Sequence, residues 1–209
     1  MELTVLNKEG KSTGKKITLS DDVFAIEPNN HAIYLDVKRY LAAQRTGTHK
    51  SKERAEVAYS TKKLKKQKGT GGARAGSRKS PVFVGGGRIF GPRPRNYDIK
   101  INEKVKQLAK KSALSHKAKS DSIVAIDSFA IDGAKTKTMV SILKNLNLTG
   151  QKTLVVVPSY DKSAYLSIRN IPGQQMRIAA ELNTYDIMNS GKILLVDNSH
   201  EVIAKYLNN

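Results

Sequence analysis

The residues with the clearest chemical potential are the lysines and arginines between Arg45 and Tyr97. This stretch carries fifteen Lys/Arg residues against two carboxylates, Glu53 and Glu56, and therefore holds +13 of the formal net charge of +19. Ammonium and guanidinium groups at this density bind phosphate oxygens and release counterions from a polyanion. The composition therefore indicates nucleic acid as a partner.

We predict that all fifteen cations contact nucleic-acid phosphates. They are Arg45, Lys50, Lys52, Arg54, Lys62, Lys63, Lys65, Lys66, Lys68, Arg74, Arg78, Lys79, Arg88, Arg93 and Arg95. Four aromatic residues lie among them and could stack on unpaired bases, namely Tyr59, Phe83, Phe90 and Tyr97. A solvated linker is the alternative, but the charge density persists over the whole stretch and folded sequence flanks it on both sides.

Catalytic and metal chemistry find little support in the residue pattern. The chain has no cysteine, and its four histidines lack the spacing of metal ligands. Ser199, His200 and Glu201 are contiguous, so on a helix they would splay around the axis, and a capping serine is the better interpretation. We therefore expect neither an enzyme nor a metal or cofactor site.

A nucleotide-binding loop is the strongest enzymatic alternative. The stretch 71–76 has the glycine spacing of a phosphate-binding loop but continues with Ser77-Arg78, where such a loop has Lys followed by Ser or Thr. No GxGxxG pattern follows a predicted strand. A nucleotide-dependent enzyme is therefore disfavoured, although the elements described next would suit one.

The elements that position the basic stretch are predicted from hydrophobic periodicity. Apolar runs predict buried strands at 123–126, 153–157 and 193–196, with a further candidate at 176–181. Helical patterns cover 33–44, capped by Asn29 or Asn30 and stopped by Gly47, and 103–119, capped by Asn102. Further helices are expected at 136–146, 162–168 and 199–207, and a helix start at Asp21. Strands at 2–7 and 16–19 flank a polar turn over 9–14.

This alternation predicts an α/β fold. We expect a three-layer globular domain with a mostly parallel central sheet, formed by residues 1–44 and 98–209. Residues 45–97 cannot bury enough apolar surface to fold alone and are predicted to form a long, extended basic loop inserted in that domain.

Three motifs in and around the basic stretch resemble one protein family. Residues 45–50 read Arg-Thr-Gly-Thr-His-Lys, residues 67–77 read Gln-Lys-Gly-Thr-Gly-Gly-Ala-Arg-Ala-Gly-Ser, and residues 91–94 read Gly-Pro-Arg-Pro. The chain is similar over essentially its whole length to the family of bacterial large-subunit ribosomal protein four. The long central string is specific to that family.

The resemblance implies a structural constituent of the large ribosomal subunit that binds ribosomal RNA and supports subunit assembly. It implies a loop tip at about 62–74 that lines the nascent-peptide exit tunnel beside the macrolide-binding region. The tip residues expected there are Lys65, Lys66, Gln67, Lys68, Gly69 and Thr70. Relatives often carry an aromatic residue just before this motif, whereas this chain has Leu64-Lys65.

The partners implied are ribosomal RNA of the large subunit, neighbouring large-subunit ribosomal proteins and, in some members, the protein's own messenger RNA. The sequence contains no run of eighteen apolar residues and no visible secretory signal, so we expect a cytoplasmic protein without a membrane partner. A free nucleic-acid-packaging or RNA-chaperone protein remains the main alternative.

Overall fold

The computed structural model describes residues 1–127, 133 and 135–208. The chain divides into two compact units. The first, which we call the globular unit, comprises Met1–Leu41 and Lys100–Asn209, and the second, the loop unit, comprises Ala42–Ile99.

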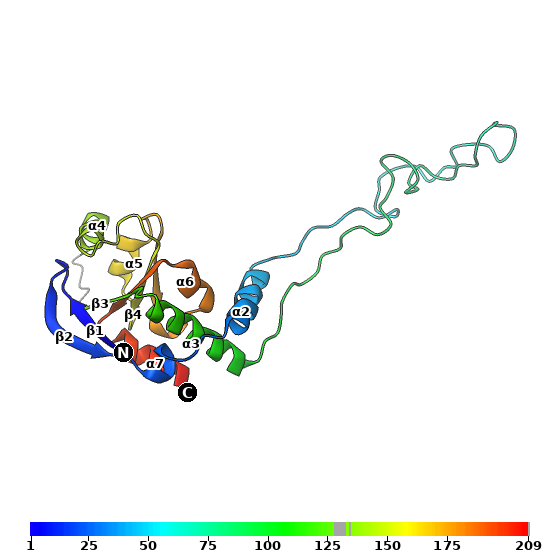
Figure 1. Ribbon diagram of the computed structural model, residues 1–209. Helices are drawn as coiled ribbons and strands as arrows, with labels where there is room; N and C mark the ends of the chain where they lie inside the picture. Colours follow the sequence, from blue (N-terminus) through cyan, green and yellow to red (C-terminus); the bar gives the residue numbers. More distant parts are fainter. Residues whose placement is uncertain (128–132, 134, 209) are drawn as a thin grey trace. The chain divides into compact units, whose positions relative to one another are not determined.

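The globular unit is organised around one six-stranded sheet (Figure 1). Its strands follow the order β2-β1-β3-β6-β4-β5, in which β1 and β2 pair antiparallel and every other pair is parallel. Their bounds are β1 Glu2–Leu6, β2 Ser12–Thr18, β3 Ile123–Ile126, β4 Thr153–Val157, β5 Gln174–Ile178 and β6 Lys192–Val196. The mostly parallel sheet confirms the predicted fold class.

Helices cover both faces of this sheet, and alternating strand residues define the two cores. Along β4, Leu154 and Val156 join one hydrophobic cluster, while Val155 and Val157 join the other. The first cluster packs against α1 Asp21–Phe24, α2 Asn30–Ala43, α3 Glu103–Lys119, α6 Thr184–Asn189 and α7 Ser199–Asn208. The second packs against α4 Thr136–Asn145 and α5 Lys162–Ile168. Strands buried on both faces explain the continuous apolar runs in the sequence.

The N-terminal hairpin differs from the prediction. We expected a polar turn over 9–14, but β2 begins at Ser12 and the turn is shorter. The Asn7 side chain holds this turn, because its Oδ1 accepts hydrogen bonds from the backbone N–H groups of Glu9 and Lys11, both at 2.9 Å. Since β2 is an edge strand with mostly exposed residues, it tolerates polar side chains that are also typical of a turn.

The segment after α5 also departs from the prediction. We expected a strand at 176–181, but β5 ends at Ile178 and a 3-10 helix, η1 Ala179–Glu181, follows it. The short helix α6 was not predicted. Its start carries an Asx cap, in which the Asn183 side chain accepts a hydrogen bond from the backbone N–H of Asp186 at 2.7 Å.

The three predicted helix caps have different outcomes. Asn102 directly precedes α3, but its side chain makes no capping hydrogen bond. Asn29 Oδ1 accepts from the backbone N–H of Ala32 at 3.0 Å, so Asn29 caps α2 as one of the two predicted candidates. Ser199 is not the predicted capping serine, because the Asn198 carbonyl begins α7 by accepting from Glu201 and Val202. Ser199 instead lies fully buried in the first turn.

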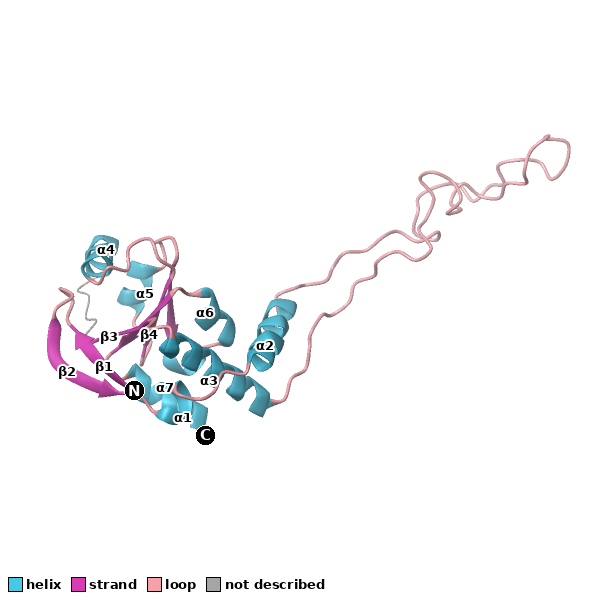
Figure 2. Ribbon diagram, in the orientation of Figure 1, coloured by secondary structure: helices cyan, strands magenta, loops and turns pink. Residues whose placement is uncertain are grey.

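Gly47 does not stop α2 directly either, since that helix ends at Ala43 and Gly47 lies in the loop unit. Between Ala43 and Glu103 the described chain contains no helix or strand (Figure 2). The loop unit is held instead by backbone hydrogen bonds between its two legs.

Candidate nucleic-acid interface

The two legs of the loop unit meet at a neck formed by Gly47 and Arg95. The Arg95 N–H donates to the Gly47 carbonyl at 3.2 Å. Gly47 has φ +64°, and a Cβ atom built on it would overlap the Arg95 carbonyl oxygen. A glycine is therefore required here both by backbone conformation and by the close approach of the opposite leg.

Tyr97 anchors the same neck by its ring. The Arg45 guanidinium lies 4.1 Å and that of Arg95 4.6 Å from the ring centroid, which is cation–π distance. The Tyr97 hydroxyl lies 3.3 Å from Nε2 of His49. Tyr97 is thus engaged within the loop, and two of the fifteen predicted RNA-binding cations, Arg45 and Arg95, help to hold it.

Beyond the neck, the carboxylates of Glu53 and Glu56 pair with cations of the loop. Lys50 forms an ion pair with Glu56, and Arg93 forms one with Glu53. The hydrogen bond from Lys50, followed by that from the Glu53 backbone N–H, lowers the pKa of Glu56. Glu53 therefore links the two legs through Arg93, whereas Glu56 and Lys50 form a pair within the first leg. In the sequence, Glu53 and Glu56 count only as two negative charges. Their spacing of three residues nevertheless allows the Glu56 side chain to accept a hydrogen bond from the backbone N–H of Glu53.

Most of the other predicted contacts remain free for an external anion. Arg78 lies over the Tyr59 ring at 5.6 Å, and Lys63 donates a hydrogen bond to Gln67. Within the described residues, no ion pair, side-chain hydrogen bond or ring contact engages nine further cations. They are Lys52, Arg54, Lys62, Lys65, Lys66, Lys68, Arg74, Lys79 and Arg88.

The far end of the loop unit closes where the Leu64 N–H donates to the Gly76 carbonyl at 3.0 Å. The predicted tip residues, from Lys65 to Thr70, lie inside this closure, and all are exposed. Gln67 is the one member of the set whose side chain is occupied, by Lys63. The tip therefore presents three lysine side chains without described partners.

The four aromatic residues of the loop differ in availability. Tyr97 is committed to the neck and Phe83 is half-buried. Tyr59 remains 42% exposed and Phe90 96% exposed. Only the last two therefore offer free surface for stacking.

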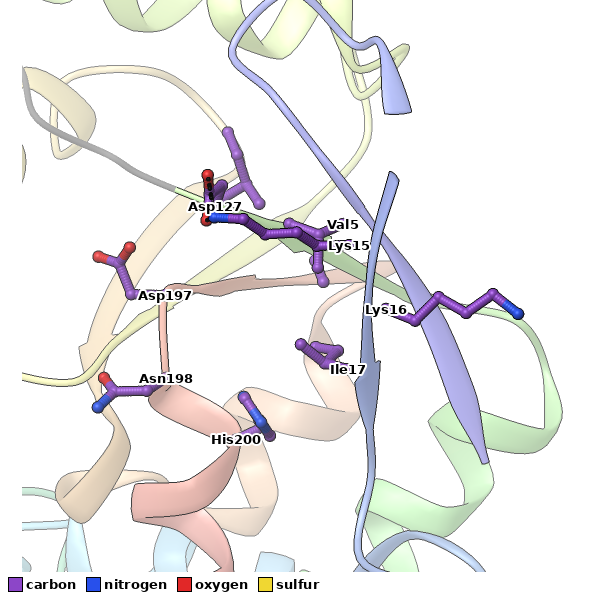
Figure 3. Close-up of a pocket in the computed structure, with 10 residues that line it drawn as sticks. Val5, Lys15, Lys16, Ile17, Asp127, Asp197, Asn198 and His200 are labelled. Atoms are coloured by element: carbon purple, nitrogen blue, oxygen red, sulfur yellow. Dashed lines mark hydrogen bonds and ion pairs between the residues drawn. The ribbon is translucent and has the colours of Figure 1, made fainter. Parts of the chain in front are cut away.

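The globular unit contains a separate cavity of about 530 Å³ at the ends of β1, β3 and β6 (Figure 3). Asp127 follows β3 and receives hydrogen bonds from Lys15 Nζ at 3.1 and 3.2 Å. Asp197 follows β6, where burial and then the charge of Asp127 raise its pKa. Ligands of open α/β sheets bind at this edge.

The described side chains at that edge do not form a catalytic set. His200 Nε2 lies 3.9 Å from Oε1 of Glu201, beyond hydrogen-bond distance, and neither His200 Nδ1 nor Ser199 Oγ has a hydrogen-bond partner within the described chain. Among the residues that the structure describes, no group of three or more His, Cys, Asp or Glu side chains could hold a metal ion. In that same set, no helix is long and apolar enough to cross a membrane.

Comparison with known proteins places the whole chain in one family. The model of the ribosomal protein L4/L1 family matches residues 17–206. The chain is 59% identical over 208 residues to large ribosomal subunit protein uL4 of Cytophaga hutchinsonii, with 100% of both chains covered. It is 53% identical over 209 residues to the uL4 protein of Amoebophilus asiaticus, with 100% of each covered, and 54% identical over 205 residues to that of Parabacteroides distasonis, with 98% of each covered. The chain therefore belongs to the ribosomal protein L4/L1 family.

Proposed function

We propose that this protein binds ribosomal RNA of the large subunit through its loop unit, with the globular unit as the scaffold. Membership of a ribosomal protein family makes it a structural constituent of the ribosome and not an enzyme. Its relatives carry the name of a large-subunit protein, which assigns it to the large subunit. Ribosomal RNA and neighbouring large-subunit proteins are then its partners, in the cytoplasm.

The observation that carries this proposal is the set of nine cations without described partners on a loop that has no hydrophobic core. Phosphate contacts from such residues position the protein and supply affinity, while they carry little base specificity. Backbone hydrogen bonds such as that between Gly47 and Arg95 hold the legs together, so part of the ordering needed for binding is already present.

Salt dependence tests the proposal directly. If about six phosphates are neutralised, the logarithm of the association constant should fall against the logarithm of salt concentration with a slope of about −4 to −5. Filter binding or fluorescence anisotropy with large-subunit RNA measures this slope. A nearly flat dependence would show that the lysines do not contact phosphates.

Competition separates RNA recognition from general nucleic-acid packaging. Duplex DNA of equal charge should compete poorly with ribosomal RNA for the protein, because the A-form RNA helix and its unpaired loops differ in shape from B-form DNA. Sedimentation of a cell extract should show nearly all of the protein migrating with large subunits. Equal competition by duplex DNA, together with a large free pool, would support the packaging alternative.

We further propose that residues Lys65 to Thr70 line the nascent-peptide exit tunnel. Support comes from the resemblance of the motif at 67–77 and from the place of these residues inside the closure between Leu64 and Gly76. The protein's own messenger RNA is a second RNA partner that the resemblance implies, and it would use the same cations.

Substitution of Lys68 tests the tunnel assignment. Lys68→Glu replaces an attraction to phosphate by a repulsion, a change of about 1–3 kcal/mol if the site is partly desolvated. Subunits should still assemble, because fourteen other loop cations remain. The expected result is altered macrolide affinity or altered stalling on tunnel-sensing peptides.

Lys68→Arg is the charge-matched control and should have a milder effect, since it keeps the cation but enlarges it. Assembled ribosomes that carry Lys68→Glu and show unchanged drug affinity and unchanged stalling would place this residue away from the tunnel wall.

A further inference from the structure

The loop unit contains a cavity of about 470 Å³ that is separate from its tip. Two segments, 51–59 and 85–88, form its walls. Its volume lies within the range of about 300–1,000 Å³ that is typical of small-molecule sites. A cavity of this size in a segment without helices or strands calls for a structural cause.

Close backbone packing forms the walls. The Arg88 N–H donates to the Lys52 carbonyl at 2.9 Å and joins the two segments, and the Gly86 N–H donates to the Phe83 carbonyl at 2.9 Å. A Cβ atom at Gly86 would overlap the carbonyl oxygen of Ser80. Gly86 therefore allows a chain approach that a larger residue would prevent, and this approach shapes one side of the cavity.

The lining combines two kinds of surface. Lys52 and Arg88 contribute cationic side chains that have no partner within the described residues. Val57 and the ring of Tyr59 contribute apolar surface. Tyr59 is 42% exposed, and the Arg78 guanidinium lies 5.6 Å from the centroid of its ring.

An aromatic ring beside two free cations matches the two halves of a nucleotide. A base stacks on an aromatic face, and its phosphate pairs with lysine or arginine. Glu53 and Glu56 do not line the cavity, and both are already paired, Glu53 with Arg93 and Glu56 with Lys50. The charge of the cavity therefore favours an anionic occupant over a peptide with basic side chains.

We propose that this cavity binds one unpaired nucleotide of an RNA strand, with the base on Tyr59 and the phosphate between Lys52 and Arg88. The site rests on the proposed RNA-binding function and adds a requirement to it. Bases inside a duplex stack on their neighbours and do not reach a side wall, so the site discriminates single-stranded from double-stranded RNA. Tyr97, which the neck occupies, takes no part.

A fluorescent RNA tests this site on the full chain. The probe is a single-stranded RNA dodecamer with one 2-aminopurine, whose fluorescence falls when the base stacks. The same strand annealed to its complement is the second probe. We expect quenching and tighter binding for the single strand, and neither for the duplex.

Three variants identify the residues responsible. Tyr59→Ala should abolish the quenching and weaken single-strand binding about tenfold, from the usual strength of base–aromatic stacking. It should leave the salt slope unchanged, because the phosphate contacts remain. Tyr59→Phe keeps the ring and should behave like the parent protein. Arg74→Ala, an exposed cation of the tip outside the cavity, should lower the magnitude of the slope by about one and leave the quenching intact.

The outcomes distinguish this proposal from the one on which it rests. Weak, salt-independent binding of both probes by the parent protein would overturn the proposed function and the nucleotide site with it. Two outcomes with salt-dependent binding would overturn the nucleotide site alone. In the first, the Tyr59→Ala variant lowers the 2-aminopurine fluorescence as much as the parent protein does. In the second, the duplex binds as tightly as the single strand. Circular dichroism of each variant confirms that the globular unit is folded.

Discussion

At the scale of single residues, Gly47 determines whether the two legs of the loop can meet. Gly47→Ala would place a Cβ atom against the Arg95 carbonyl and hold a non-glycine residue at φ +64°. The left-handed conformation alone costs about 1–2 kcal/mol, and the overlap adds to it. We expect the hydrogen bond between the Arg95 N–H and Gly47 to weaken, and hydrogen exchange of the Arg95 amide to speed up by tenfold or more.

Gly69→Ala is the matched control for this change. Gly69 has φ +79°, but a Cβ atom there would have no heavy atom within 4 Å. The control therefore carries the conformational cost without the collision, and exchange at Arg95 should stay as in the parent protein. Equal exchange rates of the Arg95 amide in the two variants would mean that the close approach of Gly47 to the Arg95 carbonyl does not affect the stability of the neck.

At the scale of elements, one buried carboxylate joins α2 to α6. Asp36 is 2% exposed, and its Oδ2 accepts a hydrogen bond from Thr184 Oγ1 at 2.6 Å while its Oδ1 accepts from Arg39 Nε at 2.9 Å. Asp36→Ala leaves the buried Thr184 hydroxyl without this acceptor. We expect a loss of about 1–3 kcal/mol in the free energy of unfolding, measured by urea denaturation.

Thr184→Val completes a double-mutant cycle for this contact. It removes the hydroxyl at nearly constant volume, and a coupling energy of at least about 0.5 kcal/mol with Asp36→Ala is expected for groups in direct contact. Additive effects of the two substitutions would show that the contact does not link the helices. Arg39→Ala should be milder than Asp36→Ala, because the Arg39 side chain is 30% exposed.

The elements that sequence reasoning predicted well are those that the two cores bury. Strands β3, β4 and β6 are continuous apolar runs, and burial on both faces requires such runs. The elements that were not predicted correctly, β2 and α6, have weaker sequence patterns. Ser12 and Thr13 belong to the exposed strand β2 although their side chains suit a turn, and α6 is too short for its periodicity to stand out.

Only some features of the candidate nucleic-acid interface could likewise be predicted from the sequence. Its cations could be counted from the sequence, because charge is a property of residue type. Which of them are free could not be predicted, since the ion pair of Arg93 with Glu53 and the cation–π contact of Arg45 with Tyr97 depend on how the legs of the loop meet. The cavity between 51–59 and 85–88 escaped sequence reasoning for the same reason.

At the scale of the whole molecule, folding and RNA binding should be separable. Both hydrophobic clusters consist entirely of residues of the globular unit, so the loop contributes nothing to the core. Replacement of residues 50–93 by two glycines removes thirteen of the fifteen loop cations but keeps the neck, where the hydrogen bond from Arg95 to Gly47 brings the ends together. A cooperative thermal transition with a little-changed midpoint is expected by circular dichroism.

The same deletion should nearly abolish RNA binding. With thirteen cations removed, the affinity for large-subunit RNA should fall by at least about a thousandfold at low salt, and the salt slope should flatten toward that of the few contacts that remain. A control that replaces the tip alone, residues 65–75, removes four of these cations and should give an intermediate slope. A deletion variant that melts without cooperativity would show that the loop is part of the folding unit. A deletion variant that folds and binds RNA as the parent protein does would show that the RNA interface lies on the globular unit, whose net charge is far smaller.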